Sequence, residues 1–214
     1  MAEPKFLVVR LGSLGDIVHT LPAVAALRET FPQAEIIWLT QARWKLLAAS
    51  SGLASKIWTT ETREFSSVLK TIRGIRGHGF NTAIDYQGLW KSASLPFLAG
   101  VKRRIGFSSQ SVREAGVPLL YTESVHAISV HVAQQNGELS KLAGARDAVA
   151  NVNLQPPLVE DEASADVMAP PGAIPAEKPA EPAAIEPSKP AKRPLPPIKP
   201  QKTTSSWFGS GRKK

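Results

Sequence analysis

The chain has 214 residues, a net charge of +8 and no cysteine, which excludes a disulfide scaffold, a zinc–thiolate site and a thiol nucleophile. Thirteen of its 18 prolines lie in the last 59 residues, so we expect a globular body over residues 1–155 and a proline-rich tail over residues 156–214. No apolar run approaches the roughly 18 residues that span a membrane, and no signal-type stretch opens the chain. We therefore expect a soluble, cytoplasmic protein.

Short apolar runs alternate with helical patterns along the body. Strands are expected at residues 5–10, 35–40, 56–59, 81–86 and 103–107. Helices are expected at residues 16–31, 41–50, 64–78, 88–100 and 129–143. Strands that alternate with helices of 10–15 residues are typical of βαβ units, so this order predicts an α/β fold: a Rossmann-like parallel sheet flanked by helices.

The tail is expected to be disordered, with a bias to polyproline II, because proline blocks the interiors of helices and sheets. Its segment Arg193–Pro197 either docks in an aromatic groove or belongs to a solvated tether.

Basic residues outnumber acidic ones in the body, which favours anionic partners: phosphorylated small molecules, nucleic acid or an acidic membrane surface. The alternative is that the charge serves solubility alone. Nucleic acid is the weakest of these partners, because the basic residues are not interleaved with aromatic ones, and we expect none.

The first motif, Arg10-Leu-Gly-Ser-Leu-Gly-Asp16, stands where the first strand meets the first helix. In doubly wound folds this edge of the sheet binds ligands, and the helix N-terminus favours negative charge. Asp16 either accepts a proton from a substrate hydroxyl or caps the helix as its N-cap residue. His19 is interpreted as a helix-face histidine.

The second motif, Ile84-Asp-Tyr-Gln-Gly-Leu-Trp-Lys-Ser92, stands where the fourth expected strand meets a helix, at the same edge of the sheet. Gln87 offers a donor and an acceptor, and Gly88 permits close approach to a ligand. Lys91 lies in the first turn of a helix, where a cation is unfavourable unless an anion binds. It either binds a phosphate or carboxylate or is a solvated surface lysine.

Together these two motifs, followed by a helix that opens with His131, resemble glycosyltransferase family 9, the bacterial ADP-heptose:lipopolysaccharide heptosyltransferases, and most of all the heptosyltransferase I branch. The resemblance covers residues 5 to about 145. It implies one half of a GT-B fold, the acceptor-binding Rossmann-like domain, and an inverting transfer of heptose from ADP-heptose to a hydroxyl of an inner-core sugar. It implies no metal and no cofactor.

The resemblance also implies residue roles. The catalytic base of the family corresponds to Asp16. Its acceptor contacts correspond to Ser13, Gly15, Gln87, Gly88 and Lys91. Four further basic residues between the two motifs are expected either to hold acidic groups of the acceptor or to form an ordinary charged surface: Arg63, Lys70, Arg73 and Arg76.

No second α/β pattern follows residue 155, so we expect the chain to lack the family's nucleotide-sugar domain and to meet ADP-heptose only if that domain is supplied in trans. Whether the chain by itself is an enzyme therefore stays open. The alternatives are a non-catalytic acceptor-domain remnant or binding module, and one half of a split enzyme. A lipopolysaccharide acceptor would also imply peripheral contact with the cytoplasmic face of the inner membrane.

Overall fold

The computed structural model describes residues 3–147 and 152. Its strands are β1 (Lys5–Val9), β2 (Glu35–Thr40), β3 (Lys56–Thr59), β4 (Thr82–Asp85), β5 (Arg103–Phe107) and β6 (Glu123–Val125). Its α-helices are α1 (Leu14–Thr30), α2 (Lys45–Ala49), α3 (Phe65–His78), α4 (Trp90–Ala99) and α5 (Val132–Leu142). Two short 3-10 helices, η1 (Ala42–Trp44) and η2 (Val117–Leu120), complete the elements of this part of the chain.

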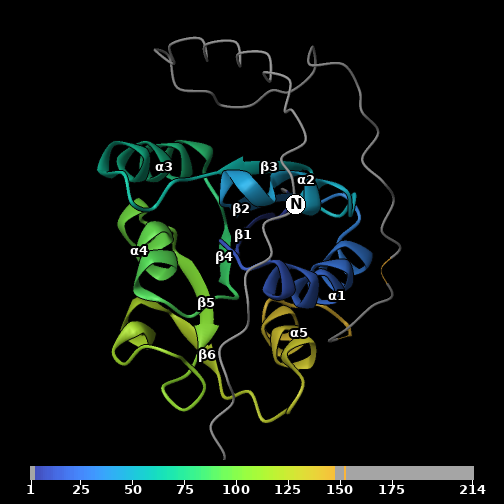
Figure 1. The fold of residues 1–214 in the computed structure, drawn as a ribbon. Coiled ribbons are helices and arrows are strands. Elements are labelled where there is room, and N and C mark those ends of the chain that lie inside the picture. Colours follow the sequence, from blue (N-terminus) through green and yellow to red (C-terminus); the bar gives the residue numbers. More distant parts are fainter. Residues whose placement is uncertain (1–2, 148–151, 153–214) are drawn as a thin grey trace, which may run out of the picture. The chain divides into compact units, whose positions relative to one another are not determined.

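The strands form one parallel sheet in the order β3-β2-β1-β4-β5-β6 (Figure 1). From β1 the chain first builds outward through β2 and β3, and it then returns to the other side of β1 with β4. This is the doubly wound order of Rossmann-like folds. Because the order reverses between β1 and β4, the carboxyl ends of these two strands are where such folds bind ligands.

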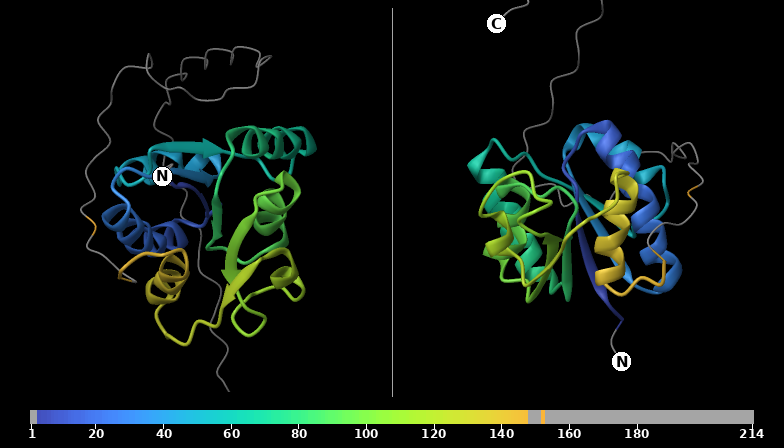
Figure 2. Two further views of the ribbon diagram at one scale, coloured as in Figure 1. Left: turned by 180° about the vertical axis from the view of Figure 1, so that it is seen from behind. Right: turned by 90° about the horizontal axis from the view of Figure 1, so that it is seen from below.

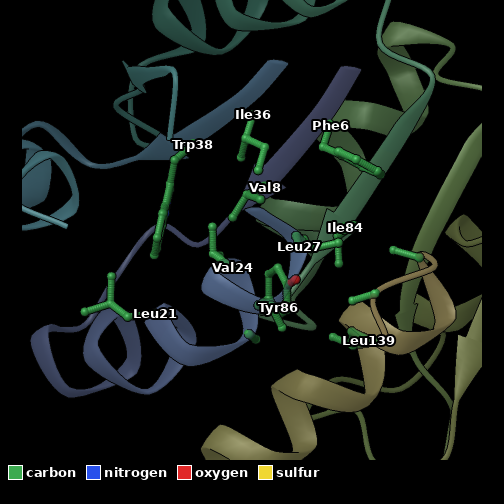
Figure 3. Close-up of a cluster of buried hydrophobic side chains, with 14 of the residues drawn as sticks. Phe6, Val8, Leu21, Val24, Leu27, Ile36, Trp38, Ile84, Tyr86 and Leu139 are labelled. Carbon is green, nitrogen blue, oxygen red and sulfur yellow. The ribbon is translucent and has the colours of Figure 1, made fainter. Parts of the chain in front are cut away.

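The central strand β1 contributes side chains to two separate cores. Phe6 and Val8 face the layer of α1, α2 and α5, whereas Leu7 and Val9 face the layer of α3 and α4 (Figure 2). Figure 3 shows the first core, which gathers Trp38 of β2 with residues of α1 and with Ile84 of β4. Since side chains alternate across a strand, burial on both faces explains the uninterrupted apolar run in β1.

The Rossmann-like parallel sheet expected from the sequence is confirmed, and each of the five expected strands and five expected helices is present. Two elements were not expected from the sequence: β6, an edge strand of three residues, and η2, which precedes it. Pro96 does not end α4, which continues to Ala99 and stops at Gly100 in the left-handed conformation (φ 79°).

The expected disorder of residues 156–214 and the segment Arg193–Pro197 lie outside the described residues, and the domain boundary at residue 155 stays a prediction. No helix in the described part of the chain has the length and hydropathy that a bilayer crossing requires.

A glycine in β5 provides a test of this packing. A Cβ at Gly106 would lie 2.2 Å from two ring carbons of Tyr121. Gly106→Ala should therefore lower the free energy of unfolding by about 1–3 kcal/mol, measured by urea denaturation. At Gly77 in α3 an added Cβ meets nothing within 4 Å, so Gly77→Ala should raise that free energy by about 0.5–1 kcal/mol. Wild-type stability in Gly106→Ala would show that Tyr121 does not cover β5.

Candidate active site

A cavity of about 450 Å³ opens at the carboxyl edge of the sheet, where the strand order reverses. Its walls come from the segments that follow β1, β2, β3 and β4. The lining residues are Leu11, Gly12, Ser13, Asp16, Gln41, Arg43, Thr62, Arg63, Gln87 and Lys91. Three of these side chains are cationic and one is anionic, so the cavity favours a ligand that carries negative charge.

Asp16 lies in the first turn of α1, and Ser13 is the N-cap residue of that helix. One carboxylate oxygen, Oδ2, accepts the backbone N–H of Ser13 at 3.0 Å, and the other, Oδ1, lies 2.6 Å from Nη2 of Arg10. The interpretation of Asp16 as the N-cap residue is therefore wrong: it supports the helix start from the third helical position, as in a capping box. Its side chain is still 22% exposed.

Arg10 is the buried partner of this carboxylate, with only 3% of its surface exposed. Its Nη2 pairs with Asp16, and its Nη1 donates to the carbonyl oxygen of Tyr86. Next to it, the N–H of Leu11 donates to Oε1 of Gln87 at 2.8 Å. These contacts join the segment after β1 to the segment after β4 across the point where the strand order reverses.

The surroundings of Asp16 keep its carboxyl group ionised. Partial burial acts to raise the pKa of Asp16, but the Ser13 N–H and the charges of Arg10 and Arg113 outweigh it. The pKa is thus held below its ordinary value of 3.8. Burial lowers the pKa of Arg10 from its ordinary value, yet an arginine stays protonated in proteins at neutral pH. The pair is therefore a carboxylate and a guanidinium at neutral pH.

The segment after β4 is shaped by Asp85, which is 1% exposed. Its Oδ1 accepts the N–H groups of Gln87 and Gly88 at 2.9 and 3.4 Å, and its Oδ2 accepts the hydroxyls of Ser92 and Tyr121 at 2.9 and 2.7 Å. Burial raises the pKa of Asp85. Gly88 turns the chain with a φ of 67°, which a residue with a side chain rarely adopts. This turn presents Gln87 to the cavity.

The structure brings most of the residues expected from the two motifs together. Asp16, Ser13, Gln87 and Lys91 all line the cavity. Two expected acceptor contacts are not among the lining residues. Gly15 is exposed in the first turn of α1, and Gly88 is buried beneath Val112.

The four expected basic residues are spread over three places. Arg63 lines the cavity, whereas Lys70 lines a separate hollow of about 490 Å³ between α3 and β3. Arg73 is exposed on α3 and lines neither. Arg76 donates to the carbonyl oxygens of Leu98 and Ala99, so its guanidinium stabilises the end of α4.

Sequence reasoning missed the pairing role of Arg10 and the lining residues Gln41, Arg43 and Thr62. A usable signal existed, because the carboxyl ends of parallel strands share one edge and these three residues follow β2 and β3 directly. Within residues 3–147 and 152, no group of three or more His, Asp or Glu side chains converges in a way that could hold a metal ion.

The model of glycosyltransferase family 9 (heptosyltransferase) matches residues 68–171. Lipopolysaccharide heptosyltransferase 1 of Escherichia coli strain K12 is 27% identical over 148 residues, which cover 63% of this chain and 46% of that protein. The protein of the same name from Pseudomonas aeruginosa is 28% identical over 126 residues, which cover 51% of this chain and 34% of that protein. The body of the chain is therefore similar to the heptosyltransferases of glycosyltransferase family 9. The chain spans less than half the length of these relatives.

Solved structures support the fold of this heptosyltransferase-like domain. E. coli heptosyltransferase WaaC with ADP-2-deoxy-2-fluoro heptose aligns with a TM-score of 0.58 at 22% identity, over 64% of this chain and 47% of that one. The family 9 glycosyltransferase of Veillonella parvula aligns with a TM-score of 0.63 at 15% identity, over 72% and 46%. The expected fold, one Rossmann-like half of a GT-B heptosyltransferase, is confirmed.

The Arg10–Asp16 pair makes stability depend on pH in a defined direction. Asp16→Asn leaves the buried guanidinium without its counter-charge and should cost about 1–3 kcal/mol at pH 7. Because the pKa of Asp16 is lowered on folding, this contribution is full above the ordinary value of 3.8 and is lost as the pH falls through the folded value. The difference in melting temperature between wild type and Asp16→Asn should be constant from pH 7 to about 5 and shrink below about 4.

A matched control for this measurement is Glu64→Gln, which removes one carboxylate from an exposed position before α3. It should change the melting temperature little at any pH. A difference between wild type and Asp16→Asn that grows toward acid pH would contradict the assignment of Asp16 as an ionised partner of Arg10.

Proposed function

We propose that this domain binds the inner-core sugar acceptor of lipopolysaccharide and accepts its proton during the inverting transfer of heptose from ADP-heptose. The observation that carries the proposal is an ionised carboxylate, Asp16, in a basic cavity at the point where the strand order reverses. The similarity to lipopolysaccharide heptosyltransferase 1, and to a structure that contains an ADP-heptose analogue, supports the choice of substrates. The proposal also places the protein in the cytoplasm.

In the proposed reaction the oxygen of an acceptor hydroxyl attacks the anomeric carbon of heptose. The new glycosidic bond forms as the bond from that carbon to the diphosphate oxygen breaks, and ADP leaves with the electron pair. Asp16 takes the proton of the attacking hydroxyl. The contacts to ADP-heptose are assigned to a second Rossmann-like domain, supplied in cis or in trans.

The cavity offers the groups that such an acceptor needs. Inner-core sugars carry acidic groups, and Arg43, Arg63 and Lys91 place three cations around the cavity. Arg43 is held by a 2.8 Å hydrogen bond from its Nη2 to Gln41 and by the face of Trp44. The volume of about 450 Å³ lies in the range of small-molecule sites.

Arg10 is the positioning residue in this proposal. It is buried behind Asp16 and does not line the cavity, so it acts on the acceptor only through the carboxylate. The 2.6 Å contact to Oδ1 and the Ser13 N–H on Oδ2 fix the plane of the carboxylate. A carboxylate oxygen has about two acceptor sites, so Oδ2 retains the capacity to accept a substrate hydroxyl.

The proposal predicts that Asp16→Asn lowers heptose transfer at least about 100-fold, because a general base is lost. The full chain is assayed with ADP-heptose, an inner-core acceptor and a heptosyltransferase donor domain, at a temperature where the variant is folded. Calorimetry with the full chain alone should show acceptor binding that changes no more than about threefold, since the cavity keeps its shape and its cations.

His19→Gln is the control for this assay, because His19 is exposed on the same helix and is not among the lining residues. It should leave transfer unchanged. Transfer by Asp16→Asn at the wild-type rate would overturn the role of Asp16, and a wild-type chain that binds no acceptor would overturn the proposal as a whole.

The positioning role of Arg10 predicts a shift in the pH profile. In Arg10→Met, Asp16 loses one of the groups that hold its pKa down, so the acid limb of the pH profile of kcat should move to higher pH. Arg10→Lys keeps a cation near Asp16, so the acid limb of its pH profile should lie closer to that of the wild type than the limb of Arg10→Met does. If both variants lose melting temperature while the acid limb stays in place, Arg10 is structural only.

A further inference from the structure

Four large apolar side chains are exposed together on the outer side of α4 and η2. Trp90, Phe97 and Leu98 are 47, 43 and 51% exposed, and Leu119 of η2 is 83% exposed. The three residues of α4 are spaced by seven and eight positions, so they lie on one side of the helix. This helix belongs to the layer on the side of the sheet opposite α1 and α5 (Figure 2). We call this surface the α4 face.

Contacts show that the α4 face is continuous. A Cβ at Gly116, where η2 begins, would lie 3.0 Å from Cζ2 of Trp90, so the indole covers the start of η2. At the other end, the guanidinium of Arg104 lies 5.4 Å from the ring centroid of Phe97 and donates to the carbonyl oxygen of Leu120 at 2.7 Å. The apolar side chains of the helix and of η2 therefore share one surface.

Cations surround this apolar surface. Arg76 donates to the carbonyl oxygen of Leu98 at 2.7 Å, Arg104 lies over Phe97, and Lys91 follows Trp90 in the chain. Lys102 is exposed at the start of the segment that leads into β5. An acidic residue, Glu114, also contacts this helix, and it accepts the N–H of Trp90 at 2.7 Å. The balance of charge is strongly positive.

We propose that the α4 face docks this domain on an anionic lipid bilayer. Tryptophan and other apolar side chains ringed by Lys and Arg match the interfacial region, where apolar groups enter the acyl boundary and cations contact anionic headgroups. Leu119 projects from the surface, which suits insertion into lipid, whereas a protein partner would need a pocket shaped to receive it. The guanidinium of Arg104 over the ring of Phe97 places a positive charge within the apolar area itself.

Docking by this face places the candidate active site beside the membrane surface. Lys91 follows Trp90 in the chain and lines the 450 Å³ cavity, so the first turn of α4 contributes to both the α4 face and the cavity. The inference rests on exposure and charge and does not depend on the proton-accepting role of Asp16. The two proposals can therefore fail separately.

Vesicle sedimentation with the full chain tests the inference. The probes are vesicles of phosphatidylethanolamine with phosphatidylglycerol and vesicles of phosphatidylcholine. The chain should bind the anionic vesicles, more weakly at high salt, and should leave phosphatidylcholine unbound. The triple variant Phe97→Ser/Leu98→Ser/Leu119→Ser should bind the anionic vesicles at least about tenfold more weakly. Lys102→Gln should weaken binding about fivefold.

The matched control is Leu46→Ser/Phe65→Ser, which removes two exposed apolar side chains from α2 and α3, away from the α4 face. It should bind like wild type, and melting curves confirm that each variant is folded. Because residues 148–214 are the same in every protein compared, a difference in vesicle binding between variants reports on the substituted side chains. Quenching by brominated lipid, compared between wild type and Trp90→Phe, reports whether Trp90 itself enters the bilayer.

Three results would overturn the inference. The first is wild-type binding by the triple variant, which would assign membrane contact to another surface. The second is equal binding to both kinds of vesicle, or to neither. The third is a dimer in solution that the triple variant abolishes, without vesicle binding by the wild type, which would make the α4 face an interface between copies of the chain.

Discussion

A buried guanidinium at the end of the central strand is the interaction on which the candidate site depends. Arg10 cannot be left unpaired in this position, because an isolated buried charge costs several kcal/mol. Its partners are Asp16, from the helix that follows β1, and the carbonyl oxygen of Tyr86, from the segment that follows β4. Satisfying this single charge thus joins the segment after β1 to the segment after β4, since Arg10 and Tyr86 are 76 residues apart in the chain. Asp85 acts from the other side, since its buried carboxylate attracts the charge of Arg10 and orders the turn that carries Gln87.

The layered fold could be predicted because it depends on local patterns. A strand buried on both faces needs a continuous apolar run, and β1 and β2 supply one. The edge strand β6 lacks this signal. It is three residues long, begins with Glu123 and is not fully buried, so its sequence resembles a loop. Its place in the sheet is set by long-range contacts, such as the pair between Glu123 and Arg103 at 2.7 Å, which no local pattern shows.

The candidate site could be predicted only in part, because it also depends on contacts between residues far apart in the chain. Asp16, Ser13, Gln87 and Lys91 belong to two motifs at strand ends, so their convergence follows from the topology of a parallel sheet. Arg10 was not recognised as a buried partner, because a basic residue that ends an apolar strand usually faces solvent. The basic residues of α3 were expected either to hold the acceptor or to form an ordinary charged surface, and the structure spreads them over different places. A helix of 14 residues spans about 21 Å, so residues spread along it cannot all reach one cavity.

The low pKa of Asp16 bears on how this carboxylate can work. A general base is most effective when its pKa is near the working pH, and Arg10 together with the Ser13 N–H moves Asp16 in the other direction. A weak base is sufficient if the attacking hydroxyl becomes acidic as its oxygen bonds to the anomeric carbon, because the proton then moves late. In that case the carboxylate contributes mainly through its fixed position and its negative charge next to a developing positive centre. A buried arginine that holds the carboxylate rigid suits this task better than it would suit strong proton abstraction. The same guanidinium that ties the two halves of the sheet together therefore also determines what kind of base the domain can offer.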